Sequence, residues 1–537
     1  MPSNKPAVMA RRRARLIGGC GDGSDILFRV PAIGRAVKIP PVPKLSAFAL
    51  VIVLLGSSSA RAADIACSTM ATTSLTRATV TLAQDVAAGA FTVPGGRGNA
   101  RGGGPYAALP AFCRVAATLK PTPQSDIKME IWLPLAGWNG KLQVVGNGAF
   151  AGTISYSAMA TALAAGYATA STDTGHTGAA SNTFTHREVL VDFANRAIHE
   201  TTVVAKRVLT QFYGKPQTFA YFNGCSTGGR QALTAAQRYP GDFDGIVAGA
   251  PATLTSSQVF SQILFHQVLS QPEAALSREA LTLLNTAALN VCDGRDGAVD
   301  GVIENPLACR VDPQLLACRE AGAAGCLTPP QVAAARKMYA GATNTRTGEP
   351  IFPGLEPGSE LGWSATPISY AVDWLKYVFS DPNWDPKTLN FDADLARVRS
   401  RDNQLLDADD PKLGDFVSRG GKLLIYQGWA EPGIPPRNIV RYYEEVKKQT
   451  KNASDGVRLF MVPGMGHCGG GNGASTFDVV AALDAWKTGG PPPASIPASR
   501  VRNGTTDRTR PLCAYPTFAA YKGSGSIDEA ANFECRQ

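Results

Sequence analysis

The sequence predicts an α/β fold, in which a mostly parallel central sheet is covered by helices and interrupted by a large inserted lid. Short apolar runs alternate with segments of helical composition over residues 127–249 and again after residue 422. Strands alternating with helices are typical of a parallel sheet covered on both faces. Between residues 253 and 415 helical segments, clustered cysteines and Asp-Gly turns replace this alternation. We therefore predict a core domain of residues 63–252 and 416–537, with residues 253–415 as its lid.

The strands of the core are predicted from apolar runs bounded by turn residues. We expect them at residues 127–134, 141–145, 167–171, 219–222, 245–249, 422–426 and 457–462. Helices are expected at residues 157–165, 193–213, 230–238, 437–448 and 477–488. The Gly-rich stretch from residue 64 to about 120 is interpreted as loops and short strands, and the Pro-rich tail after Gly489 as loop.

Residues 1–62 resemble a leader that is removed. Lys44 precedes an apolar run at residues 45–55, and Ala60 and Ala62 place small residues at a cleavage site. This arrangement is typical of a secretory signal, and the run is too short to span a bilayer. We therefore expect a secreted or periplasmic protein without stable membrane insertion.

Charge argues against nucleic acid as a partner. The whole chain carries a net charge of +9, and its first 62 residues hold ten Lys or Arg and two Asp, a net of +8. The remaining chain is therefore close to neutral, at about +1. Its high isoelectric point gives no reason to expect binding to nucleic acid or anionic membranes.

Cysteine usage indicates disulfides. Ten of the 11 cysteines follow the leader, and none of them forms a Cys-x-x-Cys pair. An even number in an exported chain favours disulfides, and the missing pair makes a zinc ribbon improbable.

The stretch Gly224-Cys-Ser-Thr-Gly228 follows a predicted strand and precedes a predicted helix. In this context Gly-x-Ser-x-Gly predicts a nucleophile elbow, a strained turn that holds a serine hydroxyl above the end of the sheet. Ser226 is therefore the candidate nucleophile.

A serine nucleophile needs a base, and the base needs an acid that orients it. The expected chain order is serine, acid, histidine, each on a loop after a strand. Of five histidines, only His467 lies far downstream of Ser226 and directly after a strand. His176 could line the floor of the site or have a structural role.

The acid should follow the predicted strand at residues 422–426. Glu431 is the only carboxylate in the loop at residues 427–436, and glutamate can orient an imidazole as aspartate does. The alternative is that Glu431 is an exposed loop residue and the acid lies elsewhere.

Cys225 immediately precedes the candidate nucleophile, and Cys468 immediately follows the candidate base. Because Ser226 and His467 must come within hydrogen-bond reach, their neighbours should lie within disulfide range. We predict a Cys225–Cys468 bridge, which excludes the rival reading of Cys225 as a nucleophile.

An oxyanion hole requires two N–H donors. One is expected from Thr227, directly after the nucleophile, and the other from the earlier Gly146-Asn147-Gly148 loop, with Gly148 as the candidate.

A further cluster lies at residues 292–304 of the lid. Asp293, Asp296 and Asp300 alternate with glycines, and the carbonyls of Ala298 and Val302 could complete an oxygen-only shell. Such ligands favour calcium over zinc. The alternative is a set of solvated Asp-Gly turns.

Together these motifs resemble the tannase and feruloyl esterase family over nearly all of the chain after the leader. The matching parts are Gly-Cys-Ser-Thr-Gly-Gly-Arg at 224–230, Gly-Trp-Ala-Glu-Pro at 428–432, Gly-His-Cys at 466–468 and Cys-Asp-x-x-Asp-Gly-x-x-Asp-Gly at 292–301. The resemblance implies an α/β-hydrolase core, a large lid and a bridge between the neighbours of the triad.

It also implies a structural calcium ion in the lid at the five residues of the cluster. It further suggests the bridges Cys67–Cys113, Cys292–Cys309, Cys318–Cys326 and Cys513–Cys535. The family acid is usually aspartate, and Glu431 departs from that pattern.

The resemblance implies an exported serine carboxylesterase that acts on small esters of aromatic acids such as ferulate, gallate or chlorogenate. A terephthalate-monoester hydrolase, a peptidase or thioesterase on the same triad, and a catalytically weak phenolic-binding homologue are the alternatives. Ile434 favours the plant phenolics, because relatives that act on terephthalate monoesters tend to have an aromatic residue there. Trp363, Trp374 and Tyr377 are candidates for the acyl pocket, and the sequence does not indicate the oligomeric state.

Overall fold

The structure is a computed structural model. It describes residues 65–95, 105–178, 184, 186–320, 323–400 and 405–537. The predicted leader at residues 1–62 lies outside the described residues. The chain from Arg61 to Gln537 forms one unit, and the descriptions below concern that unit.

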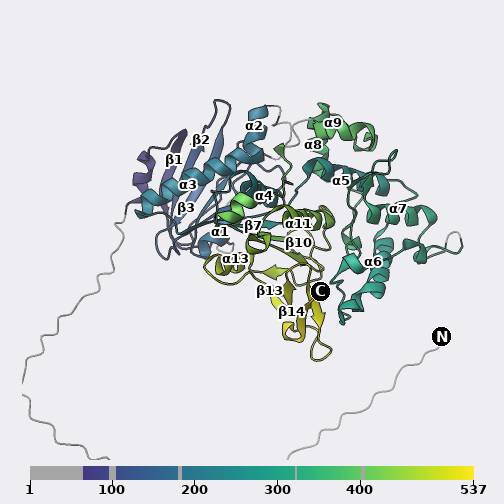
Figure 1. Cartoon of the computed structure of the whole chain (residues 1–537). Helices are drawn as coiled ribbons and strands as arrows, with labels where there is room; N and C mark the ends of the chain where they lie inside the picture. The colour runs from purple at the N-terminus through teal and green to yellow at the C-terminus, as the bar shows by residue number, and fades with distance from the viewer. Residues whose placement is uncertain (1–64, 96–104, 179–183, 185, 321–322, 401–404) are drawn as a thin grey trace, which may run out of the picture. The chain divides into compact units, whose positions relative to one another are not determined.

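A nine-stranded sheet forms the centre of this unit (Figure 1). Its strands are β1 (Ala78–Val86), β2 (Phe112–Leu119), β3 (Ile127–Pro134), β4 (Lys141–Val145), β5 (Ala168–Thr172), β6 (Phe219–Cys225), β7 (Gly245–Gly249), β10 (Lys422–Gly428) and β11 (Val457–Val462). They lie in the order β1-β2-β3-β5-β4-β6-β7-β10-β11. The pairs β1–β2, β2–β3 and β3–β5 are antiparallel. The five pairs that follow in this order, from β5–β4 to β10–β11, are parallel. The predicted mostly parallel sheet is confirmed.

The register of the parallel strands brings three C-terminal ends to the same edge. Cys225 at the end of β6 pairs with Gly249 of β7, and Gly249 pairs with Tyr426 of β10. Gly428 at the end of β10 pairs with Val462 of β11. Loops that follow parallel strands at one edge form the usual site of such sheets.

Alternating side chains of each strand pack on opposite faces, as the two-residue period of a strand requires. Phe222 belongs to the hydrophobic cluster formed with helices α3 (Ala197–Tyr213), α4 (Thr227–Arg238) and α11 (Arg437–Gln449). Its neighbour Tyr221 belongs to the cluster formed with α13 (Val479–Lys487). Helix α1 (Tyr156–Ala164) packs in a further cluster with Val145 and Trp132.

The predicted core helices are confirmed with small shifts, except at the start of α3. The pattern predicts one helix from residue 193, but a short helix α2 (Arg187–Val191) and one π-helical turn (Asp192–Arg196) precede it. Two further short helices are α10 (Gly414–Ser418) and α12 (Ala453–Gly456).

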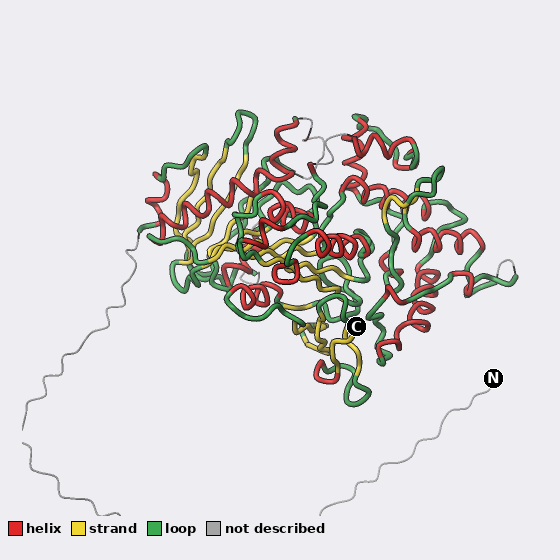
Figure 2. Tube along the Cα trace, in the orientation of Figure 1, coloured by secondary structure: helices red, strands yellow, loops and turns green. Residues whose placement is uncertain are grey.

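The interpretation of the tail after Gly489 as loop is wrong. It forms strands β13 (Ser495–Arg502) and β14 (Thr505–Cys513), which pair with each other, and β13 also pairs with β12 (Thr476–Phe477) (Figure 2). A separate pair consists of β15 (Phe518–Tyr521) and β16 (Phe533–Arg536). Arg508 and Arg510 occupy buried positions of β14. Charged residues at inward positions hide the alternation by which a strand is recognised. The stretch before residue 120, where loops and short strands were expected, contains the longer strands β1 and β2.

The chain between β7 and β10 is mainly helical, as predicted for the lid, and Figure 1 shows its helices grouped apart from β1 to β3. They are α5 (Thr255–Leu269), α6 (Arg278–Cys292), α7 (Pro329–Ala340), α8 (Ser369–Phe379) and α9 (Ala393–Ser400), with a short hairpin of β8 (Ala342–Thr343) and β9 (Pro350–Phe352). This segment, hereafter the insertion, has its own hydrophobic cluster, which also includes Phe150, Phe184 and Phe193. The boundaries at residues 253 and 415 stay predictions.

Helix α4 approaches β7 so closely that Gly229 has no room for a side chain. A Cβ atom there would overlap the carbonyl oxygen of Gly249 and lie 2.9 Å from the Cα of Pro251. We expect Gly229→Ala to destabilise the fold by about 1–3 kcal/mol, the usual cost of overpacking. Gly241→Ala is the control, because its Cβ would meet only an Arg419 nitrogen at 3.8 Å. Equal thermal unfolding midpoints for the two variants would contradict this account.

Candidate active site

Ser226 occupies a sharp turn between a strand and a helix. It lies between the last residue of β6 and the first residue of α4, with φ 65° and ψ −120°. A positive φ is strained for a residue with a side chain and is found where the surroundings impose it. Here the Ser226 amide donates to Gly249 O at 2.9 Å, and the Arg230 amide donates to Ser226 O at 3.0 Å. The turn has the geometry predicted for a nucleophile elbow.

Glycines allow this turn to close. A Cβ atom on Gly224 would lie 2.7 Å from the carbonyl carbon of Gly228, and one on Gly146 would lie 2.6 Å from the Gly228 Cα. The elbow, the start of α4 and the loop after β4 therefore meet through backbone alone.

Glu431 holds the candidate base. The Nδ1 of His467 lies 2.5 Å from Glu431 Oε2, and the other carboxylate oxygen accepts from the amides of Gly433 at 2.7 Å and Ile434 at 3.2 Å. Glu431 is fully buried, whereas 43% of the His467 side chain is exposed. The longer glutamate side chain is thus fixed by the backbone of its own loop, and the alternative of an exposed loop glutamate is wrong.

Burial lowers the pKa of His467, but the hydrogen bond and the negative charge of Glu431 outweigh it, so that this pKa is raised above its ordinary value. A carboxylate at Nδ1 also fixes the ring tautomer that leaves Nε2 free to accept a proton.

The predicted bridge between the neighbours of serine and histidine is confirmed. Cys225 and Cys468 form a disulfide, with their Cα atoms 6.0 Å apart across a sequence separation of 243 residues. It joins the end of β6 to the loop after β11 and excludes Cys225 as a nucleophile.

The predicted oxyanion loop is fixed against the start of α4. The Gly228 amide donates to Asn147 O at 2.7 Å, and the Thr227 hydroxyl donates to Ala149 O at 2.8 Å. The side chain of Gln231 binds both the amide and the side chain of Asn147. Thr227 is the first residue of its helix, so its amide has no acceptor within that helix. Gly148 lies exposed between these contacts.

His176 supports the same loop, a role that the sequence left open. Its Nε2 lies 2.7 Å from Phe150 O, and its Nδ1 lies 3.2 Å from the Thr174 hydroxyl. Burial lowers the pKa of His176, so the ring is neutral at neutral pH and its Nε2–H can donate to that carbonyl. His176 therefore holds the backbone at Phe150, two residues after Gly148. In the sequence, the only signal for this role was that His176 follows a predicted strand.

A cavity of about 290 Å³ adjoins the histidine and its acid. Its lining comprises Gln262, Phe265, Met338, Leu355, Gly362, Trp363, Ser364, Thr366, Ile368, Tyr370, Glu431, Pro432, Gly433, Ile434 and His467. Trp363, a candidate for the acyl pocket, and Ile434 both line this cavity. Ser226 is not one of the lining residues, so the cavity lies on the histidine side of the site.

The other predicted pocket aromatics do not line this cavity. Trp374 is fully buried and packs its ring 5.9 Å from that of Phe150 and 5.1 Å from that of Tyr377. Both residues support the insertion from within.

A second cavity, of about 500 Å³, meets His467 from another direction. It shares Gly362 and Pro432 with the first, and adds Trp429, Leu361 and the Gly-rich chain around Gly466. The imidazole of His467 thus lines both cavities.

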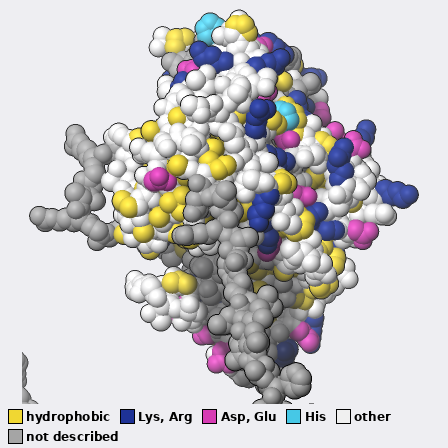
Figure 3. Space-filling model, turned by 90° about the vertical axis from the view of Figure 1, so that its left-hand side faces the viewer, with side chains coloured by type: hydrophobic (Ala, Val, Ile, Leu, Met, Phe, Trp, Pro, Cys, Tyr) yellow, Lys and Arg dark blue, Asp and Glu magenta, His cyan; other side chains and the backbone are white. Residues whose placement is uncertain are grey.

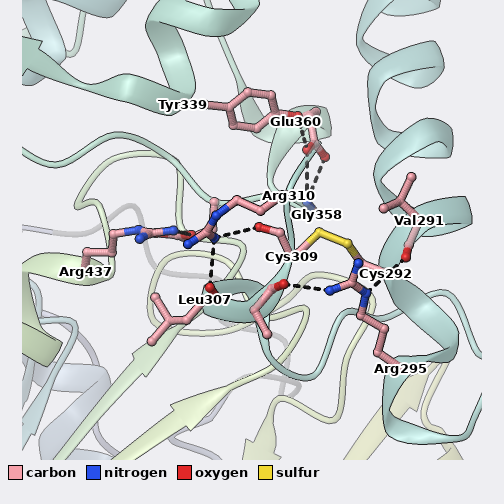
Figure 4. Close-up of a disulfide and its surroundings, with 12 residues drawn as sticks. Val291, Cys292, Arg295, Leu307, Cys309, Arg310, Tyr339, Gly358, Glu360 and Arg437 are labelled. Atoms are coloured by element: carbon pink, nitrogen blue, oxygen red, sulfur yellow. Dashed lines mark hydrogen bonds and ion pairs between the residues drawn. A yellow bond between two sulfur atoms is a disulfide. The ribbon is translucent and has the colours of Figure 1, made fainter. Parts of the chain in front are cut away.

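The four bridges implied by resemblance are all present. They are Cys67–Cys113, Cys292–Cys309, Cys318–Cys326 and Cys513–Cys535. Figure 4 shows Cys292–Cys309 at the end of α6, with Arg295 donating to the carbonyls of Val291 at 3.2 Å and Ala308 at 2.7 Å. This bridge closes the base of the predicted metal loop.

The carboxylates of that loop are buried and directed inward, rather than solvated. Asp293 accepts from the amides of Asp300 at 3.1 Å and Gly301 at 2.9 Å. Asp296 Oδ1 accepts from Ala298 N at 3.1 Å, whereas its buried Oδ2 has no partner among the described residues. Burial and the nearby charges of Asp300 and Asp293 raise the pKa of Asp296 to about 6.

These residues fit a hard cation held partly by backbone oxygens. Among the described residues no three His, Cys, Asp or Glu side chains form a metal cluster by themselves. The calcium site predicted from the sequence would also need the carbonyls of Ala298 and Val302. Asp300 is also bound by Arg508 and Arg510, two cations of β14 that the sequence did not connect to it.

The sheet order, the elbow after β6 and the helical insertion after β7 define an α/β-hydrolase fold. A family model for tannase and feruloyl esterase matches residues 113–536. The chain belongs to this family and is a carboxylic ester hydrolase.

Named relatives agree with this assignment. The chain is 37% identical to an uncharacterized esterase of Xanthomonas campestris pv. campestris, over 91% of this chain and 94% of that protein. It is 34% identical to feruloyl esterase C of Talaromyces stipitatus, over 80% of this chain and 86% of that one. The crystal structure of feruloyl esterase B from Aspergillus oryzae matches with a TM-score of 0.81 and 31% identity, over 88% of this chain and 99% of that one.

On the face drawn in Figure 3, basic and acidic side chains lie interspersed rather than gathered by sign. No helix in the described ranges is long and apolar enough to cross a membrane.

The Glu431–His467 pair predicts a pH dependence. Glu431→Gln keeps an oxygen for the amides of Gly433 and Ile434 but removes the charge that raises the pKa of His467. We expect kcat/KM for an ester to fall by about 10³–10⁴-fold, as for loss of a triad acid. Because a general base acts only when neutral, the acidic limb of the pH profile should also move to lower pH.

The profile of kcat/KM against pH measures both effects. Glu349→Gln, at an exposed position of the insertion, is the control. A Glu431→Gln variant with normal activity would show that another carboxylate orients His467.

Proposed function

We propose that the protein is an exported serine esterase that hydrolyses esters of aromatic, phenolic acids such as ferulate, gallate or chlorogenate through an acyl-enzyme. The observation that carries the proposal is the carboxylate-bound His467, joined to the Ser226 elbow by the Cys225–Cys468 bridge and facing an apolar cavity. Relatives named feruloyl esterase support an aromatic, phenolic acid as the acyl part of the substrate.

In the proposed reaction Ser226 Oγ attacks the ester carbonyl while His467 Nε2 accepts its proton. The amides of Thr227 and Gly148 donate to the oxygen that becomes negative, and the Glu431 carboxylate stabilises the imidazolium. When the tetrahedral intermediate collapses, His467 returns the proton to the departing alcohol. Water then attacks the acyl-enzyme by the same steps, and the aromatic acid leaves.

The two cavities beside His467 support separate binding sites for the acyl group and the alcohol group of the ester. The 290 Å³ cavity has Phe265, Trp363 and Ile434 in its lining and suits an aromatic acyl group. The 500 Å³ cavity is larger, has six glycines in its lining, and suits a larger alcohol. Both cavities meet at the imidazole that must protonate the alcohol.

Export is supported by the disulfides. Five bridges connect ten cysteines within the described residues. Such bridges form and persist in oxidising compartments, which agrees with a secreted or periplasmic protein.

Side-by-side turnover of methyl ferulate, methyl gallate, chlorogenate and monomethyl terephthalate tests the proposed activity. We expect phenolic esters to be hydrolysed and Ser226→Ala to reduce kcat by about 10⁶-fold, as loss of a triad serine does. Labelling by a serine-directed fluorophosphonate should disappear in Ser226→Ala and remain in Ser157→Ala. A variant without Ser226 that keeps its activity would exclude the mechanism, and a wild-type chain that neither labels nor turns over would be a binding homologue.

We further propose that the loop at residues 292–304 holds a structural calcium ion. Asp293, Asp296 and Asp300 would supply carboxylate oxygens, and Ala298 and Val302 would supply carbonyls. The buried, unpartnered Oδ2 of Asp296 and the Cys292–Cys309 bridge at the base of the loop support this assignment. A bound ion would neutralise the carboxylates and fix the loop, and no step of ester hydrolysis depends on it.

Chelation tests the calcium proposal. We expect a calcium chelator to lower the thermal unfolding midpoint by several degrees, because a ligand that binds only the native state stabilises it. Added calcium should restore the midpoint, and Asp296→Asn should abolish the response, whereas Asp126→Asn at an exposed position should keep it. A midpoint that does not respond, together with no calcium binding by titration calorimetry, would contradict the proposal.

A further inference from the structure

Among the described residues that line the cavity beside His467, the histidine is the only one that can carry a positive charge. Its fifteen lining residues include one carboxylate, Glu431, and neither lysine nor arginine. An acyl ring that carried its own carboxylate would be brought toward the negative charge of Glu431 without a fixed cation to compensate it. Burying an unpaired charge is strongly unfavourable, so the cavity suits a neutral ring.

Tyr370 lines this cavity, and two buried amides bind its hydroxyl. Gln258 Nε2 donates to the Tyr370 hydroxyl at 2.9 Å, and Gln262 Nε2 also donates to it. The Gln262 amide donates in addition to Gly433 O at 2.8 Å, which fixes its orientation. Both glutamines lie on α5 and are buried.

Two amide donors occupy the acceptor positions of the phenol oxygen, whereas the Oε1 atoms of Gln258 and Gln262 are buried without a partner among the described residues. In this arrangement Tyr370 engages a further group as a donor. Among the hydrogen bonds of the described residues none uses the Tyr370 proton. Burial raises the pKa of Tyr370 to about 12, with Glu431 adding to the effect of burial, so the hydroxyl keeps its proton over the working range of pH.

Tyr370 also lies between the two parts of the catalytic machinery. Through Gln262 and Gly433 its hydroxyl is connected to the loop of the acid. Its ring meets that of Phe150 edge-on, with centroids 6.0 Å apart, two residues after Gly148 in the oxyanion loop. An acyl group bound beside His467 is therefore within the space that Tyr370 borders.

We propose that Tyr370 is a specificity-determining residue, which donates a hydrogen bond to an oxygen substituent on a neutral aromatic acyl ring, and that the cavity excludes a ring bearing a carboxylate. The proposal rests on the proposed function and narrows it, because it selects hydroxylated aromatic esters over monoesters of aromatic dicarboxylic acids. The recognition depends on the two glutamines that leave Tyr370 only its proton to offer.

The test compares kcat/KM for methyl 4-hydroxycinnamate, methyl cinnamate and monomethyl terephthalate. We expect the wild-type protein to favour the hydroxylated ester over the unsubstituted one by about tenfold or more, because the unsubstituted ring leaves the Tyr370 proton unpaired. The terephthalate monoester should be at least about 100-fold poorer than the hydroxylated ester. In Tyr370→Phe the ratio between the two cinnamates should fall toward one.

Tyr213→Phe is the matched control. It removes a hydroxyl that donates to Pro134 O at 2.9 Å, and Tyr213 does not line either cavity beside His467. This variant should keep the wild-type ratio. A Tyr370→Phe variant that loses activity on both cinnamates equally would overturn the proposal, because it would show a structural role in holding the Gln262 amide. Efficient hydrolysis of the terephthalate monoester would overturn it as well.

Failure of the proposed function gives a different result. If the wild-type protein hydrolyses none of these esters, the esterase assignment to phenolic substrates falls. Binding of the same esters to Ser226→Ala, measured by calorimetry, then tests recognition by Tyr370 independently of catalysis. The hydroxylated ester should bind about tenfold more tightly than the unsubstituted one, and Tyr370→Phe in the same background should remove the difference. Equal affinities before that change would overturn the proposal.

Discussion

The site depends on one covalent constraint, the Cys225–Cys468 bridge. It connects the last residue of β6 to the loop after β11, two elements separated by 243 residues and by two intervening strands of the sheet. Each half-cystine is adjacent to a residue of the proposed triad, so the bridge limits how far the Ser226 turn and the His467 loop can separate. Both turns include strained backbone, with positive φ at Ser226 and Cys468. The bridge helps to maintain conformations that neither loop would adopt alone.

The remaining groups are positioned by hydrogen bonds in which backbone atoms take part. Glu431 is fixed by two amides of its own loop, and the oxyanion loop is fixed by Gly228 and His176. This explains how glutamate can replace aspartate as the acid. Its additional methylene is accommodated because Gly433 and Ile434 donate to one carboxylate oxygen and leave the other for His467.

Local sequence was sufficient to predict the strands and helices whose apolar residues follow a regular pattern. The parallel strands, the elbow and the order of Ser226, Glu431 and His467 follow from apolar runs and from loops that come after them. Contacts between distant segments were not accessible in this way. Strand β14 escaped prediction because Arg508 and Arg510 point inward to Asp300, and a strand rule expects apolar residues there. The roles of His176 and Tyr370 depend on Phe150, Gln258 and Gln262, whose proximity no sequence spacing reveals.

The insertion packs against the predicted oxyanion loop, because Phe150, which follows that loop, belongs to the hydrophobic cluster of the insertion. Phe150 follows that loop and packs against Trp374 and Tyr370 of α8, while Gln262 of α5 binds the loop of the acid. A shift of α5 relative to α8 would therefore disturb the acyl cavity and the loop of Glu431 together. The proposed recognition by Tyr370 and the orientation of the proposed base are thus coupled through one buried polar cluster. A buried polar cluster of this kind tolerates few alternatives, since an amide that loses its partner pays the full cost of its desolvation. Sequence changes at Gln258, Gln262 and Tyr370 should consequently be constrained as a set, although only Tyr370 and Gln262 line the cavity.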